Sequence, residues 1–113
     1  MGYKVVGVTA CIMGVAHTYM SAESLEKFCK KDPRFDSVHV ETQGSIGVEN
    51  KLKKDWIEEA DIVILTNEIH IKERERFDNK IVHEINGDVL IKYPAKVMDE
   101  AIKKYEEKYP SKL

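Results

Sequence analysis

Four segments of this chain carry the hydrophobic patterns of β-strands. Residues 3–9 and 61–66 are apolar at almost every position, which is typical of strands buried on both faces of a sheet. Residues 37–42 alternate between apolar and polar side chains, as expected for a second strand. Residues 80–85 are the fourth predicted strand.

Helical spacing appears between these strands, with apolar side chains three and four positions apart. A first helix is predicted over residues 15–31, a short second helix around residues 52–60, and a last helix from Pro94, which suits a first helical turn. Residues 69–77 are predicted to be a loop with one helical turn, and residues 86–88 a break. The predicted inward-facing side chains of the first and last helices are Thr18, Ser21, Ala22, Leu25, Phe28, Cys29, Val97, Met98, Ala101, Ile102 and Tyr105.

Strands that alternate with helices predict a parallel sheet with right-handed crossovers. We therefore expect a single, Rossmann-like α/β domain over residues 1–113, with a core over residues 3–105 and a charged tail over residues 106–113. Its open four-stranded parallel sheet has the predicted order 2-1-3-4 and helices on both faces, with a phosphate-binding loop after strand one. In this order the end of the first strand is the topological switch point, where open α/β sheets bind ligands.

Composition narrows the class of protein. The chain has 113 residues, 42% hydrophobic and 34% charged, which fits one folded domain and excludes a disordered protein. A formal net charge of −2 gives no electrostatic basis for binding nucleic acid. No apolar run is long enough for a signal peptide or a membrane span, so we expect the cytoplasm as the location.

The two cysteines have different surroundings. Cys29 falls on the inner face of the first predicted helix, where a thiol is inert packing, whereas Cys11 directly follows the first strand. Two cysteines are too few for a disulfide scaffold, and no bridge between them is expected. We also expect no metal site, because the histidines have no recognised ligand spacing with the cysteines. The histidines are His17, His39, His70 and His83.

The segment that begins with Cys11 has the composition of a phosphate-binding loop. Small residues, Gly14 among them, let the backbone approach an anion, and the helix that follows adds free N–H groups and its dipole. These groups also lower the pKa of a thiol and so favour the thiolate. His17 and Thr18 are candidates to contact a phosphate. Alternatively, Cys11 is a small buried side chain at a strand end and His17 a surface residue of the first helical turn.

A second loop follows the second strand at the same edge of the predicted sheet. It covers residues 43–50, and its Gln43 and Ser45 are candidates to contact a phosphate or a docked partner. The alternative is an ordinary glycine-rich turn.

The cysteine loop lacks an arginine. Low-molecular-weight tyrosine phosphatases grip the phosphate with an arginine on the corresponding loop, but here His17 stands six residues after Cys11 and the first arginine is Arg34. A phosphocysteine on this loop would lack the usual clamp for rapid hydrolysis. The pattern therefore favours a carrier that passes its phosphoryl group to another molecule. A small cysteine phosphatase, a thiol redox protein and a phosphate-sensing binding module are the alternatives.

Several separated stretches of the sequence resemble the IIB component of the fructose-type (fructose-like) phosphoenolpyruvate-dependent sugar phosphotransferase system. They fall within residues 3–85, so the resemblance covers most of the chain. The matching stretches are residues 8–11 and 14–23, 40–50, 60–65 and 75–77.

The resemblance implies a phosphocarrier enzyme. Cys11 would accept a phosphoryl group from a phosphohistidine of a IIA protein and transfer it to fructose or a related sugar bound by the membrane IIC component, so that the protein would work transiently at the inner face of the membrane. No cofactor beyond the covalent phosphoryl group is implied. Where the family usually has Pro-Thr or Pro-Ser after the cysteine, this chain has other residues, so one hydroxyl and the stiffness of proline are missing. The implied phosphate-binding loop consists of Ile12, Met13, Gly14, Val15, Ala16, His17 and Thr18, with His17 as the second catalytic residue.

Overall fold

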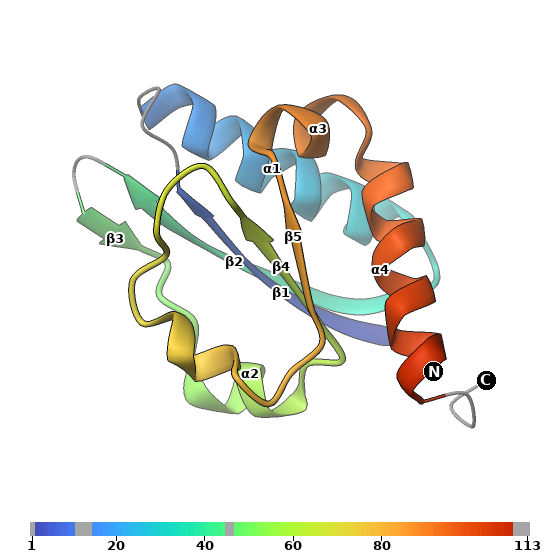
Figure 1. Ribbon diagram of the computed structural model, residues 1–113. Helices are drawn as coiled ribbons and strands as arrows, with labels where there is room; N and C mark the ends of the chain where they lie inside the picture. Colours follow the sequence, from blue (N-terminus) through green and yellow to red (C-terminus); the bar gives the residue numbers. More distant parts are fainter. Residues whose placement is uncertain (1, 11–14, 45–46, 110–113) are drawn as a thin grey trace.

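One β-sheet separates two layers of helices in the computed structural model, which describes residues 2–10, 15–44 and 47–109 (Figure 1). Within these ranges the strands are β1 (Tyr3–Ala10), β2 (Phe35–Gly44), β3 (Gly47–Glu49), β4 (Ile62–Thr66) and β5 (Val82–Ile85). The helices are α1 (Val15–Lys31), α2 (Lys54–Glu59), α3 (Gly87–Lys92) and α4 (Pro94–Lys108), with a short 3₁₀ helix, η1 (Arg74–Phe77).

The sheet of the described residues is mixed and has five strands in the order β3-β2-β1-β4-β5. β1 pairs in parallel with β2 and β4, and β4 pairs in parallel with β5, whereas β3 runs antiparallel to β2. The predicted sheet was therefore wrong in its strand count and its full order. β3 turns back along β2, with Gly44 opposite Gly47, whose φ of 110° is a conformation that favours glycine. The four predicted strands are parallel neighbours inside this larger sheet.

The predicted helices agree with the structure more closely. α1 begins and ends as predicted, α4 begins at Pro94, and η1 is the helical turn expected within residues 69–77. The predicted break at residues 86–88 was wrong, because α3 begins there. The Asn86 side chain accepts a hydrogen bond of 2.8 Å from the Asp88 N–H and so caps that helix.

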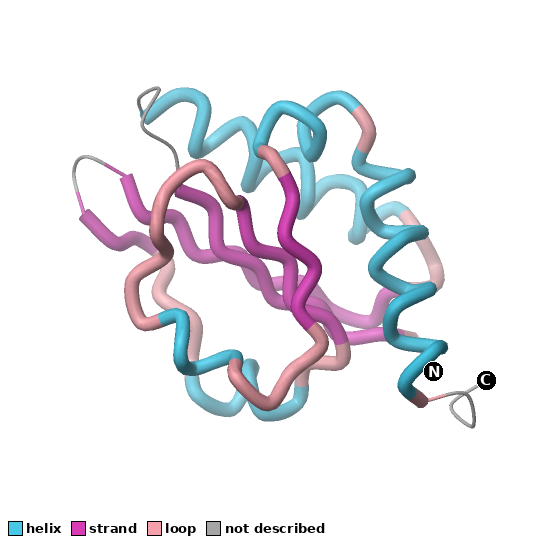
Figure 2. The backbone as a smooth tube through the Cα atoms, in the orientation of Figure 1, coloured by secondary structure: helices cyan, strands magenta, loops and turns pink. Residues whose placement is uncertain are grey.

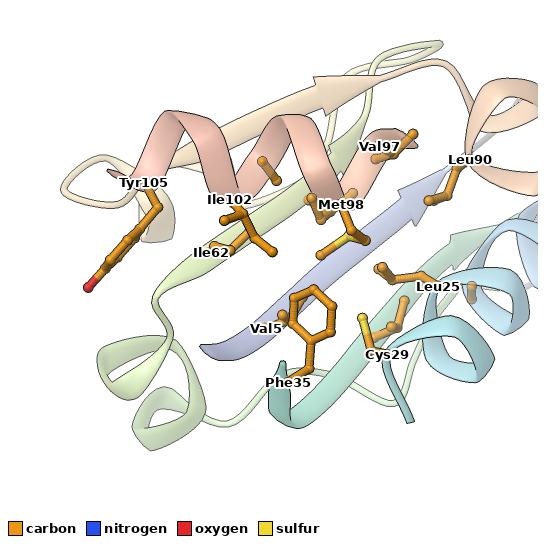
Figure 3. Packing of buried hydrophobic residues seen from close by; sticks show 14 residues of the cluster. Val5, Leu25, Cys29, Phe35, Ile62, Leu90, Val97, Met98, Ile102 and Tyr105 are labelled. Carbon is orange, nitrogen blue, oxygen red and sulfur yellow. The ribbon is translucent and has the colours of Figure 1, made fainter. Parts of the chain in front are cut away.

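The main core lies between the sheet and the layer of α1, α3 and α4. Side chains of α4, including Met98 and Ile102, lie over Val5 of β1 and Ile62 of β4 (Figure 3). The predicted inward-facing residues are buried except Phe28, which is partly buried. A second cluster fills the other face of the sheet, beneath α2 and η1.

One glycine lets α1 come close to the middle of the sheet. A Cβ atom built on Gly7 of β1 would lie 2.7 Å from Cδ2 of Leu25 and 3.2 Å from the Ile64 carbonyl oxygen. A side chain at this position would press on Leu25 of α1 and on the β4 main chain, so glycine permits the close packing of α1 on β1.

Candidate functional site

The carboxyl ends of β1, β4 and β5 lie at one edge of the sheet, where α1 also begins (Figure 2). β1 ends at Ala10 and α1 starts at Val15, and both of these residues lie at this edge. Four predicted residues of the phosphate-binding loop, namely Cys11, Ile12, Met13 and Gly14, lie outside the described residues, as does Ser45. Their roles stay predictions, and the site is built here from its described neighbours.

Hydrogen bonds hold the chain on both sides of residues 11–14. The Thr66 hydroxyl, at the end of β4, accepts a hydrogen bond of 2.9 Å from the Ala10 N–H and donates one of 3.1 Å to the Ala10 carbonyl. The Thr9 hydroxyl donates a hydrogen bond of 3.0 Å to the Thr18 carbonyl of α1. Thr9, Thr18 and Thr66 are all buried. The end of β1 is therefore tied to β4 and to the first turn of α1.

His17 stands in the first turn of α1 between two carboxylates. Its Nε2 atom lies 2.6 Å from Oδ1 of Asp88, and its Nδ1 atom lies 3.7 Å from Oε2 of Glu68. An ionised carboxylate only accepts hydrogen bonds, so Nε2 donates to Asp88. This hydrogen bond with His17 lowers the pKa of Asp88. We refer to His17, Glu68 and Asp88 as the histidine cluster.

The junction of β5 and α3 closes around the His17 ring. The Gly87 N–H donates a hydrogen bond of 2.5 Å to Oε1 of Glu68. A Cβ atom built on Gly87 would lie 2.6 Å from that oxygen, 2.9 Å from Oγ of Ser21 and 3.0 Å from Cε1 of His17. A side chain at this position would therefore displace the groups that surround the ring.

The sequence pattern did not point to Glu68, Asp88 or Thr66 as site residues. The Asn86-Gly87-Asp88 stretch has the residue types of a helix N-terminus, and reading it so would have brought Asp88 to this edge. Glu68 has no distinctive local pattern, and its place depends on contacts with residues far along the chain.

Gln43 has protein partners at both ends of its buried side-chain amide. Its Oε1 atom accepts a hydrogen bond of 2.7 Å from the Lys72 N–H, and its Nε2 atom donates to the Lys72 carbonyl at 3.1 Å and to Oε2 of Glu41 at 2.7 Å. These bonds fasten the chain after β4 to β2. Contact between Gln43 and a phosphate stays a prediction.

Two further residues of the predicted phosphate-binding loop lie in the described part of α1. Ala16 is exposed and Thr18 is buried.

Glu41 carries a buried charge beside Gln43. Its side chain is 1% exposed. It accepts hydrogen bonds from both terminal nitrogens of Arg76, at 2.9 and 3.1 Å, and from the Leu52 N–H at 3.0 Å. Burial alone would raise the pKa of Glu41, but the hydrogen bonds from Arg76, Gln43 and Leu52 outweigh it and lower the pKa. We refer to Glu41, Gln43, Lys72 and Arg76 as the arginine network.

Cys29 is packed in the main core, as predicted. It is 1% exposed, and burial, with a smaller effect of Asp32, raises the pKa of its thiol to about 12. A thiol with this pKa is almost entirely protonated at neutral pH, so it is a poor nucleophile.

No group of three or more His, Cys, Asp or Glu side chains in the described ranges is arranged to hold a metal ion. A search of those ranges also finds no helix with the length and apolar character needed to cross a bilayer.

Comparisons with known proteins agree on one family. Residues 6–100 match the family model described as "PTS system, Lactose/Cellobiose specific IIB subunit". The chain is 46% identical over 97 residues to the PTS system fructose-like EIIB component 2 of Escherichia coli, which covers 86% of this chain and 90% of that protein. It is 37% identical to the PTS system fructose-specific EIIB'BC component of Rhodobacter capsulatus, covering 88% of this chain and 17% of that longer protein.

A solved structure repeats the match at the level of the fold. A domain of the fructose-specific IIABC component of Borrelia burgdorferi superposes with a TM-score of 0.83 and 40% sequence identity. The alignment covers 91% of this chain and 96% of that domain.

Proposed function

Because this chain belongs to the IIB components of the fructose-type sugar phosphotransferase system, and is therefore a phosphotransferase of sugar uptake, we propose that Cys11 carries the phosphoryl group. The observation that supports this assignment most directly is the place of Cys11 in the chain. It follows Ala10, the last residue of the central strand β1, at the switch-point edge of the sheet, and α1 starts at Val15.

The proposed reaction has two transfers. The Cys11 thiolate attacks the phosphorus of a phosphohistidine on a IIA protein, so that an S–P bond forms and the P–N bond breaks, with the imidazole leaving. A sugar hydroxyl then attacks the same phosphorus. An O–P bond forms, the S–P bond breaks, the hydroxyl proton passes to solvent or a base, and the thiolate is regenerated. Both steps need in-line approach and stabilisation of the phosphoryl oxygens.

The proposed oxygen-stabilising groups come from residues 12–18. Free N–H groups at the start of α1 would bind the phosphoryl oxygens, aided by the helix dipole. His17 would join them by donating its Nε2–H hydrogen bond to a phosphoryl oxygen in place of Asp88. The Asp88 side chain is 65% exposed, so its attraction for His17 is screened by water, and a phosphoryl group with up to two negative charges competes with it.

Both partners of this carrier are part of the proposal. The donor is a IIA phosphohistidine protein, and the acceptor is fructose or a related sugar bound by a membrane IIC component, which brings this chain to the inner face of the membrane. The printed name of the Rhodobacter capsulatus relative, EIIB'BC, supports the second partner, because it combines B and C components in one protein.

Labelling with a phosphorylated IIA protein tests the proposal. We expect intact-mass measurement to show one added phosphoryl group on the wild-type chain, none on Cys11→Ser and one on Cys29→Ser. We also expect iodoacetamide to alkylate Cys11 faster than Cys29 near pH 7, because burial keeps Cys29 protonated.

Three results would contradict the proposal. Label retained by Cys11→Ser would place the phosphoryl group elsewhere. Turnover of a chromogenic phosphate ester without sugar or partner would favour a cysteine phosphatase. A wild-type chain that no phosphorylated IIA protein labels would favour a phosphate-sensing binding module.

A further inference from the structure

We propose that Thr66 is a positioning residue for the reaction, because its side chain is hydrogen-bonded to Ala10, the residue directly before Cys11. This inference rests on the proposed role of Cys11. One hydroxyl, that of Thr66, bonds both main-chain polar groups of Ala10, accepting at 2.9 Å and donating at 3.1 Å. The two residues are 56 positions apart in the sequence, so the link is made only by the fold.

The Thr66 hydroxyl extends the hydrogen bonding between β1 and β4 beyond the point where their main-chain pairing ends. The register of β1 with β4 runs from Val5 opposite Ile62 to Val8 opposite Leu65 and goes no further. Ala10 lies beyond the end of that register and is 1% exposed. Buried N–H and C=O groups need partners, and a hydroxyl can serve as donor and acceptor at once. Thr66 therefore supplies, from the β4 side, the hydrogen-bond acceptor and donor that a further pair of main-chain residues would have supplied.

The geometry around this hydroxyl restricts its movement. Thr66 is 1% exposed, and its β-branched side chain has few accessible rotamers in a packed site. The Thr9 hydroxyl, also near the end of β1, donates a hydrogen bond of 3.0 Å to the Thr18 carbonyl in the first turn of α1. The Thr66 hydroxyl thus holds Ala10, and the Thr9 hydroxyl links the end of β1 to the first turn of α1. A misplacement of a reacting group by about 1 Å can cost on the order of a hundredfold in rate.

Thr42 offers a matched control on the neighbouring strand. It lies on β2 opposite Thr9 and is 3% exposed. Its hydroxyl has no hydrogen-bond partner among the residues that the structure describes. The change Thr42→Val therefore removes a buried hydroxyl without removing a described hydrogen bond, whereas Thr66→Val removes two.

The experiment compares Thr66→Val, Thr66→Ser and Thr42→Val with the wild-type chain. The readouts are the rate of phosphoryl transfer from a phosphorylated IIA protein, the pH dependence of Cys11 alkylation, and the melting temperature. We expect Thr66→Val to slow transfer about tenfold or more and to move the alkylation profile to higher pH, since the anion-binding groups no longer converge as well on the sulfur. Thr66→Ser should keep the hydroxyl and stay within about threefold of wild type, and Thr42→Val should leave transfer and alkylation unchanged.

Two outcomes would overturn the inference. One is a folded Thr66→Val protein with the wild-type transfer rate and alkylation profile. The other is equal slowing by Thr42→Val. If Thr66→Val does not fold, Thr66→Ala leaves space for a water molecule beside Ala10, and the same slowing relative to Thr66→Ser is expected. If the wild-type chain takes up no phosphoryl group, the proposed function fails, while the alkylation profiles still decide the role of Thr66.

Discussion

Two charged clusters stand at the same edge of the sheet, and they are built differently. In the arginine network, Glu41 is 1% exposed and Arg76 binds it through two nitrogens, with further hydrogen bonds from Gln43 and Leu52. In the histidine cluster, the His17 ring has one hydrogen bond to an exposed carboxylate, and its Nδ1 atom, at 3.7 Å from Glu68, makes no hydrogen bond among the described residues.

The difference indicates what each cluster can do. A buried ion pair whose partners are all satisfied has no better alternative arrangement, so it holds the β4–η1 segment against β2. A ring held by one exposed carboxylate can exchange that partner for an incoming anion at little cost. The arginine network therefore serves the fold, whereas the proposed function would use the exchangeable partner of His17.

The largest effect is expected from breaking the arginine network. Arg76→Met leaves the Glu41 charge buried without its partner, and removing one member of a buried pair typically costs about 3–5 kcal/mol in the free energy of unfolding. Urea denaturation measures this loss. The matched control is Arg74→Met, because the ion pair of Arg74 with Glu84 is largely exposed and pairs of this kind contribute about 0–1 kcal/mol. Equal losses in the two variants would show that burial of the pair has no special weight.

The complementary change removes the histidine ring. His17→Ala should slow phosphoryl transfer about ten- to a hundredfold, since a hydrogen bond to a charged group contributes roughly 1.5–3 kcal/mol and each 1.36 kcal/mol corresponds to a factor of ten. Its melting temperature should change little. Rapid-quench transfer assays and thermal unfolding measure the two quantities, with the exposed His70 as control in His70→Ala. An unchanged transfer rate with a large loss of stability would assign His17 to the fold.

A smaller effect should follow from crowding the histidine cluster without removing any of its charges. Gly87→Ala places a methyl group 2.6 Å from Oε1 of Glu68 and 3.0 Å from Cε1 of His17, so the Glu68 carboxylate must move and the ring is crowded. We expect transfer to slow about three- to tenfold, which corresponds to roughly 0.7–1.4 kcal/mol. Gly44→Ala is the control, since its Cβ meets no described atom within 4 Å. A Gly87→Ala protein as fast as Gly44→Ala would mean that the ring position is not critical.

The smallest effect is expected in the pH dependence of stability, as distinct from stability at neutral pH. Because the pKa of Glu41 is lowered from its ordinary value of 4.5, its ionised form contributes stability that is fully present above that value and is lost as the pH falls through the lowered pKa. Glu41→Gln should therefore flatten the decline in urea midpoint below about pH 4.5, in addition to lowering the midpoint at pH 7. Glu75→Gln, at an exposed position of η1, should keep the wild-type slope. A wild-type slope in Glu41→Gln would show that Glu41 does not dominate acid unfolding.

Local patterns predicted most of the elements. The spacing of Leu25 and Cys29 placed α1 correctly on the sheet, and both residues are buried. β3 escaped prediction because a strand of three residues, Gly47–Glu49, is too short for alternation to be visible. α3 escaped because its first residues, Gly87 and Asp88, are also common in turns.

The candidate site was likewise predictable where neighbouring residues form a pattern and unpredictable where distant residues meet. The phosphate-binding role of residues 11–18 was predicted from adjacent residues and stays a prediction, whereas the partners of His17 and Ala10 came from the structure. Gln43 illustrates the limit: its position after the predicted second strand made it a candidate for phosphate contact, but it lies within β2 and its amide is bonded to Lys72, which is 29 positions away.

The sequence by itself determined the four parallel strands, the first and last helices, their buried faces and the family, because periodicity and motifs are properties of neighbouring residues. Only the tertiary structure decided that Thr66 holds Ala10 and that Asp88 holds His17, across 56 and 71 positions. Contacts of this range depend on which strands lie side by side and on how far each one extends. Hydrophobic periodicity encodes which face of an element is buried, but it does not encode which polar groups meet at the end of the sheet.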